Sequence, residues 1–201
     1  MRQSINVVDY DPTWATQFAT LRSEISSAVG GVAVAIEHVG STSVPGLAAK
    51  PIIDIDLVLG SSADVLVAIE RLAAIGYHHV GNLGVEGREA FESPPQPPQR
   101  HVYVCVQGGT ALQNHLMLRD FLRKNSDAAA EYGRLKKQLA VQFPTDIGQV
   151  HRREDGLHSE SAPRDGHARS TIDRHWCRQQ TQGMIEDVSA ETCDSLARRR
   201  P

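Results

Sequence analysis

The stretch from Glu37 to Leu59 reads EHVGSTSVPGLAAKPIIDIDLVL and contains the features that decide the fold. Its second half, Ile52 to Leu59, has the length and the β-branched content of a buried strand. Asp54 and Asp56 are separated by one residue on that strand, so both side chains point to the same face of the sheet. Carboxylates placed in this way predict a cation site.

A turn of small residues precedes this strand and contains Gly40, Ser41 and Thr42. Small residues let backbone N–H groups approach a phosphate closely, so the turn predicts a phosphate contact. Helix capping is the alternative role of the two hydroxyls, and it is compatible with phosphate binding because a helix N-terminus is itself an anion site. Lys50, just before the strand, can reach a phosphate, pair with Asp54, or be an ordinary surface lysine.

Apolar periodicity predicts helices and strands on both sides of the stretch. Asp11 and Pro12 signal a helix start, and Gly30 ends an apolar stripe made of Trp14, Phe18, Leu21, Ile25 and Val29. Further helices are expected at 63–75 and 111–123, the latter capped by Thr110, and another begins at Asp127. Strands are expected at 32–36, 52–59, 77–80 and 101–106, with a hairpin at 81–91 and an extended proline-rich loop at 94–99.

Composition indicates one domain in a reducing cytoplasm. A formal net charge of −3 gives no general attraction to nucleic acid or to an anionic membrane. The three cysteines lack C-x-x-C spacing, which argues against a disulfide framework and a zinc site, and Cys105 is expected to be a core thiol. We find neither a signal peptide nor an apolar run long enough for a membrane helix.

A Gly-Ser turn followed by Asp-x-Asp on a strand resembles the nucleotidyltransferase superfamily, and the fuller text EHVGSTSVPGLAAKPIIDID resembles the signature of the GrpB family. Members of this family also occur fused to dephospho-CoA kinase. The resemblance covers roughly residues 5 to 147. Its other matching segments are Tyr10 to Trp14, Gly87 to Glu89, His101 to Cys105, Asn114 to Leu116 and Arg119 to Arg123.

The resemblance implies an α/β (α+β) nucleotidyltransferase-like fold, a mixed β-sheet flanked by helices. It also implies that Asp54 and Asp56 are catalytic and hold Mg²⁺, while the Gly40 to Thr42 turn positions phosphates. The superfamily usually supplies a third carboxylate from a later strand, but the expected strand at 101–106 carries none. The remaining candidates for that carboxylate are Glu86, Glu89, Glu92 and Asp120.

Several other side chains have two possible roles, one structural and one in ligand binding. Arg88, His115 and Arg119 are candidate phosphate contacts, and the last two lie one helical turn apart on one face. His38 can form core hydrogen bonds or touch a ligand, whereas His101 and His115 favour structure or substrate positioning over metal ligation. A basic face made of Arg134, Lys136 and Lys137 is expected to be solvated.

The sequence changes character after residue 147. No lysine occurs beyond Lys137, whereas arginines become frequent and the apolar residues keep no period. We therefore divide the chain into a domain at 1–147 and a divergent tail at 148–201. The tail is either a disordered basic segment or the translation of an out-of-frame 3′ end. A sequence rich in arginine and without lysine favours the second explanation.

Three functional hypotheses follow. The first is a domain that binds a nucleotide or another phosphate-bearing small molecule with Mg²⁺ and can transfer a nucleotidyl group to an unknown acceptor. The second is a non-catalytic accessory module of dephospho-CoA kinase in the coenzyme A pathway, with a protein partner. The third is a damaged gene product without activity. No nucleic-acid or membrane partner is expected.

Overall fold

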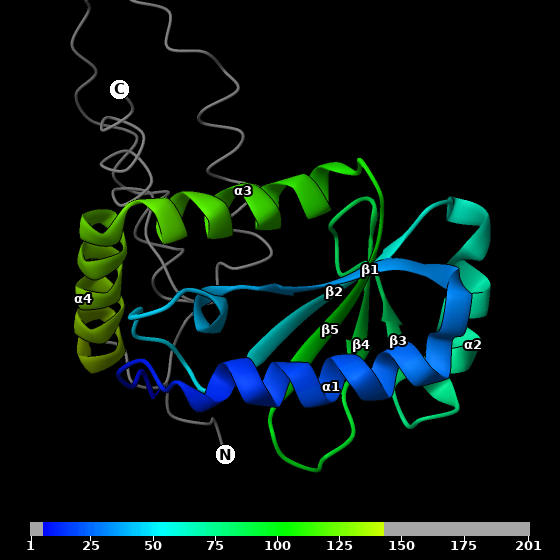
Figure 1. Ribbon diagram of the computed structural model, residues 1–201, viewed down its shortest axis with the longest axis horizontal. Helices are drawn as coiled ribbons and strands as arrows, with labels where there is room; N and C mark the ends of the chain where they lie inside the picture. The colour runs from blue at the N-terminus through cyan, green and yellow to red at the C-terminus, as the bar shows by residue number, and fades with distance from the viewer. Residues whose placement is uncertain (1–5, 143–201) are drawn as a thin grey trace, which may run out of the picture.

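The strands form one mixed five-stranded sheet with the order β1-β2-β5-β4-β3 (Figure 1). The computed structural model describes residues 6–142. The β2–β5 pair is parallel and the other pairs are antiparallel. The strands are β1 (Ala33–Val39), β2 (Ile53–Leu59), β3 (His78–Gly81), β4 (Arg88–Glu92) and β5 (Arg100–Val106).

Helices cover both faces of this sheet (Figure 1). The α-helices are α1 (Thr13–Val29), α2 (Val65–Ala73), α3 (Thr110–Lys124) and α4 (Ser126–Gln142). Short 3₁₀ turns are η1 (Gly30–Val32), η2 (Ser41–Ser43) and η3 (Ser62–Asp64). Helices α1 and α2 pack on one face and α3 on the other, while α4 turns away from α3 and stands across one end of the sheet (Figure 1).

Strand β2 separates apolar from acidic side chains by its two-residue period. Ile53, Ile55 and Leu57 point into the main core, which they share with Trp14 of α1. The alternate residues, Asp54, Asp56 and Val58, therefore lie on the face that α3 covers, where Val58 packs against Ala111 and Leu112. Both acids are thus on one face, as predicted.

Most predicted elements are confirmed, including the mixed sheet flanked by helices. In α1, Trp14, Leu21, Ile25 and Val29 are buried and Phe18 packs against them. The predicted first strand was too short, because β1 continues to Val39 through its pairing with β2. Gly109, not Thr110, is the N-cap of α3.

The predicted solvated basic face of α4 is wrong at one residue. Lys136 is only 2% exposed and its Nζ lies 5.1 Å from the centroid of the Tyr132 ring. Tyr132 belongs to the apolar side of α4 that packs on Val44 and Leu47. Since residues four apart lie on the same helix face, Lys136 is buried with Tyr132.

Among residues 6–142, no helix combines the length and the apolar character needed to cross a membrane. The tail predicted from residue 148 lies outside the described residues.

Candidate functional site

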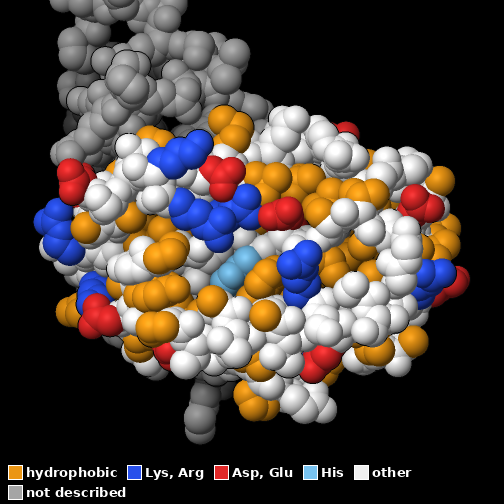
Figure 2. Space-filling view, in the orientation of Figure 1, with side chains coloured by type: hydrophobic (Ala, Val, Ile, Leu, Met, Phe, Trp, Pro, Cys, Tyr) orange, Lys and Arg blue, Asp and Glu red, His pale blue; other side chains and the backbone are white. Residues whose placement is uncertain are grey.

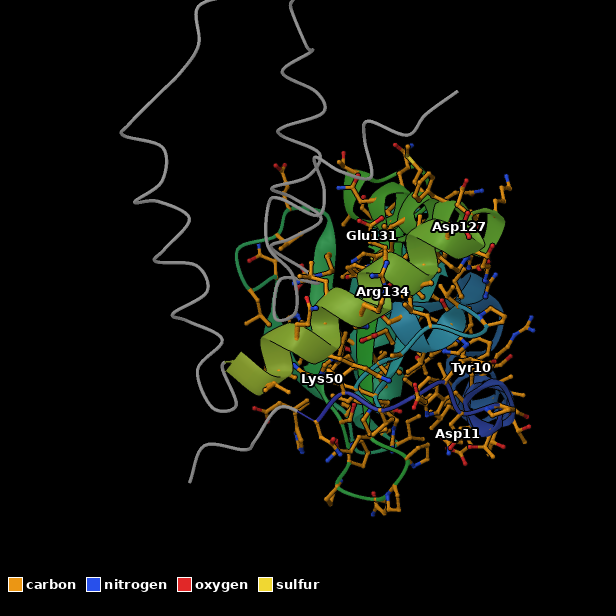
Figure 3. All side chains as sticks on the ribbon, turned by 90° about the vertical axis from the view of Figure 1, so that its left-hand side faces the viewer. Tyr10, Asp11, Lys50, Asp127, Glu131 and Arg134 are labelled. Carbon is orange, nitrogen blue, oxygen red and sulfur yellow. The ribbon has the colours of Figure 1, made fainter. Side chains whose placement is uncertain are left out.

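A cavity of about 920 Å³ lies between the sheet and α4. It is next to Asp54, on the face of β2 that carries both acids, which we call the acidic face. This volume lies in the upper part of the range of about 300–1,000 Å³ that is usual for small-molecule sites. Figure 3 views the molecule from the α4 end, with Lys50 beneath that helix. The polar and aromatic side chains that line the cavity include Ser41, Lys50, Asp54, Arg88, Glu92, His101, Tyr103, Tyr132 and Lys136.

Asp54 lies at the wall of this cavity, and a histidine holds one of its oxygens. His101 Nδ1 is 3.0 Å from Asp54 Oδ1, across the parallel pair of β2 and β5. The other oxygen, Oδ2, faces Gly40, where an added Cβ would lie 2.8 Å from Asp54 Cγ. Gly40 was predicted to allow close approach to a phosphate. In the structure it allows the turn to approach this carboxylate.

Asp56 is fully buried and pairs with His115 of α3. His115 Nδ1 lies 2.8 Å from Asp56 Oδ2, and the side chains are 7% and 0% exposed. Burial disfavours the cation, but the charge of Asp56 and the hydrogen bond to it outweigh burial, so the pKa of His115 is raised above 6.5. The second oxygen, Asp56 Oδ1, is buried without a hydrogen-bond partner among the described residues.

The Gly-Ser turn is held from inside by a chain of hydrogen bonds. Thr42 Oγ1 donates to the Ile52 carbonyl over 3.1 Å, so it can accept from His38 Nε2, also 3.1 Å away. The His38 ring stacks on Phe18 with centroids 4.5 Å apart. Burial lowers the pKa of His38 to about 4, so the ring is neutral at pH 7 and protonated at Nε2. Thr42 therefore uses its hydroxyl to fix the turn.

The His38 contact predicts a loss of stability in acid. Unfolded His38 binds a proton near pH 6.5 and folded His38 near pH 4, so the free energy of unfolding falls as the pH drops through this window. The loss is on the order of 3 kcal/mol. Urea unfolding between pH 7 and pH 4 measures it, and His38→Gln removes most of the slope. The exposed His78 is the matched control, and an equal slope in His38→Gln and His78→Gln would contradict the assignment.

Two arginines of α3 hold the end of β1 and the turn that follows it. Arg119 Nη1 donates to Glu37 over 2.7 Å and to the His38 carbonyl over 3.1 Å. Arg123 donates to the Ser43 carbonyl through Nε and Nη2, over 3.0 and 2.8 Å. Figure 2 shows Lys and Arg side chains beside Asp and Glu side chains on this face. Arg119 and His115, predicted as one phosphate-binding face, bind different acids and do not line the cavity.

The four candidates for a third carboxylate are dispersed. Glu89 pairs with His79 over 2.6 Å and Asp120 with Arg119 over 2.8 Å. Glu86 is exposed outside the cavity lining, whereas Glu92 does line the cavity. Glu92 is on β4, two strands and so roughly 10 Å from β2. Within residues 6–142, no three His, Cys, Asp or Glu side chains are grouped as metal ligands.

The basic side of the cavity is on β4 and α4. Arg88 is 4% exposed, and its guanidinium lies over the Tyr103 ring, 4.4 Å from the centroid. Sequence reasoning selected Arg88 but not Tyr103, Tyr132 or Lys136. The spacing of Tyr132 and Lys136 on one helix face was the available signal for the last two. Cys105 is a buried free thiol, and burial raises its pKa, as expected for a core residue.

The two carboxylates on β2 are oxygen donors of the kind that Mg²⁺ prefers, but only Asp54 lines the cavity, whereas Asp56 is fully buried. This ion prefers oxygen ligands and is commonly held by one or two carboxylates together with substrate phosphates. Each Asp has one oxygen bonded to a histidine, which orients the carboxylate in the way that outer partners orient metal ligands. The unsatisfied Asp56 Oδ1 is the observation that favours a cation here.

Comparison with known proteins gives the family. The model of the GrpB protein family matches residues 4–158. UPF0157 protein YqkA of Bacillus subtilis is 36% identical over 154 residues, which cover 77% of this chain and 45% of YqkA. A dephospho-CoA kinase of Mycolicibacterium paratuberculosis is 27% identical over 171 residues, covering 73% of this chain and 42% of the kinase.

The crystal structure of conserved protein GrpB from Enterococcus faecalis matches 90% of this chain and 98% of its own, with a TM-score of 0.68 and 28% identity. The predicted family resemblance is confirmed over the acidic strand, the Gly-Ser turn and the helices around them. The chain belongs to the GrpB family.

Proposed function

We propose that the protein binds a nucleotide, or another phosphate-bearing small molecule, in the cavity beside Asp54. The cavity itself is the observation that carries the proposal, because it combines the Ser41 turn and Asp54 with an excess of cations. Its lining contains the basic residues Lys50, Arg88, Arg100 and Lys136, against the acidic residues Asp54 and Glu92. Concave sites with a few convergent charged groups are typical of small anionic ligands.

In this proposal Asp54 and Asp56 hold Mg²⁺, which neutralises phosphate charge when bound. His101 and His115 keep the two carboxylates in place. Gly40 lets the turn lie close to Asp54, and Ser41 is the hydroxyl of the turn that lines the cavity.

Transfer of a nucleotidyl group is the further step of this proposal. An acceptor oxygen attacks the α-phosphorus of a nucleoside triphosphate, the bond from that phosphorus to the bridging oxygen breaks, pyrophosphate leaves, and the acceptor proton passes to water. The four candidates for a third carboxylate are dispersed, and the described residues contain no three-carboxylate cluster. We therefore place binding before transfer in this proposal.

A thermal-shift titration tests the binding. Nucleoside triphosphates with Mg²⁺ should raise the unfolding temperature of the wild type, and Asp54→Asn should lose most of that shift, because binding to the folded state stabilises it. Glu24→Gln on the exposed side of α1 is the matched acid-to-amide control and should behave like the wild type. Indistinguishable shifts of the unfolding temperature in the wild type and Asp54→Asn would refute the proposal that the protein binds a metal and a nucleotide.

The accessory role is the alternative, favoured by the sequence match to dephospho-CoA kinase. Under this alternative the cavity recognises dephospho-CoA or coenzyme A for a kinase partner. The same titration distinguishes the two proposals: a larger shift with dephospho-CoA than with nucleoside triphosphates, independent of Mg²⁺, favours the accessory role.

A further inference from the structure

Arg88 is a buried cation whose hydrogen-bonding capacity is incompletely used. Its Nε and Nη1 are buried and have no hydrogen-bond partner within residues 6–142. The guanidinium is stacked on Tyr103 and faces the cavity. Unpaired buried donors on a charged group are costly, and a guanidinium is well suited to bind oxyanions. Arg88 is therefore poised for an anion that comes from the cavity.

The surroundings of Arg88 favour an anion with more than one charge. Lys136 of α4 lines the same cavity and adds a second buried cation. Glu92, on the same face of β4, is the acid of this wall, four residues from Arg88. Strand β5 separates β4 from β2, a spacing of roughly 10 Å between the two backbones. Arg88 is level with Cys105 and Val58, so Asp54 also lies four residues further along β2. The cavity lining thus has an acidic residue on β2, Asp54, and two buried cations on β4 and α4, Arg88 and Lys136.

We propose that Arg88, stacked on Tyr103 and assisted by Lys136, forms a second phosphate subsite, distinct from the Gly40–Ser41 turn. The ligands of this protein then carry phosphate at two positions: the nucleotide phosphates beside Asp54, and a phosphate of the acceptor or of a second ligand on Arg88. The first position rests on the proposed function, whereas the Arg88 subsite stands on its own contacts.

Inorganic phosphate is the probe, titrated by calorimetry in EDTA at constant ionic strength so that the Asp54 side holds no divalent ion. The wild type should bind phosphate, and Arg88→Met should weaken binding by about tenfold or more. Without phosphate, Arg88→Met should unfold at a temperature no lower than the wild type, because it removes an unsatisfied buried charge and keeps an apolar stem on Tyr103. Arg134→Met, on the exposed face of α4, is the matched control and should bind phosphate normally.

Three outcomes overturn the subsite: equal phosphate affinity in Arg88→Met and the wild type, tighter binding of acetate than of phosphate, or loss of phosphate binding when saturating ATP and Mg²⁺ are present. If Arg88→Met does not fold, Arg88→Lys replaces it, and an undiminished affinity there contradicts recognition by the guanidinium. Phosphate binding that needs Arg88, combined with no binding of ATP and Mg²⁺, separates the two proposals by supporting the subsite and refuting the nucleotide.

Discussion

Gly40→Ala should destabilise the protein and displace Asp54. Gly40 has φ +67° and ψ −175°, a backbone conformation that residues other than glycine adopt at a cost of about 1–3 kcal/mol. An added Cβ would also lie 2.8 Å from Asp54 Cγ and 2.9 Å from Asp54 Cβ, so the whole carboxylate has to move. Overpacking of this kind adds about 1–3 kcal/mol.

Gly30→Ala separates these two costs. Gly30 has a similar backbone conformation, with φ +59° and ψ −144°, but its added Cβ would meet only the end of the flexible Arg71 side chain, at 3.2 Å. Urea unfolding should therefore show a larger loss for Gly40→Ala than for Gly30→Ala. Under the proposed function, binding of ATP with Mg²⁺ should be lost in Gly40→Ala and retained in Gly30→Ala. Equal stability losses with intact binding in both variants would show that the contact with Asp54 is unimportant.

Local sequence rules were sufficient for the strand that carries the acids. The two-residue period placed Asp54 and Asp56 on one face, and the apolar run predicted the buried opposite face that Ile53, Ile55 and Leu57 form. The small residues of the Gly40 turn predicted a close approach to a phosphate, and the structure shows that Gly40 lies against Asp54. The predictions for the strand succeeded because each depends on neighbours within one element.

The partners of the acids could not be predicted in the same way. His115 is 59 residues from Asp56, and Arg119 is 82 residues from Glu37, so their pairing depends on how α3 crosses the sheet. Basic residues on a helix surface are usually solvated, so Lys136 was predicted to be exposed. Its burial follows from the packing of Tyr132 on the loop after η2, a contact between distant segments.

Asp56→Ala should cause the other large effect, because it removes one partner of a buried ion pair. Breaking such a pair costs about 3–5 kcal/mol, since it leaves the other charge buried without compensation. The double variant Asp56→Ala/His115→Leu removes both polar groups and should be more stable than Asp56→Ala alone. A double-mutant cycle built from urea unfolding, with His115→Leu as the fourth protein, measures this coupling.

The pH dependence of that cycle identifies its origin. The pKa of His115 is raised above 6.5 in the folded protein, so the pair contributes fully below pH 6.5 and its contribution is lost as the pH rises through the folded pKa. The cost of Asp56→Ala should therefore be larger at pH 6 than at a pH above the folded pKa of His115, and His115→Leu should remove this difference. A cost that is the same at both pH values would mean that Asp56 stabilises the fold by packing and that His115 carries no charge there. In that case the hydrogen bond between His115 Nδ1 and Asp56 Oδ2 would join the carboxylate to a neutral ring.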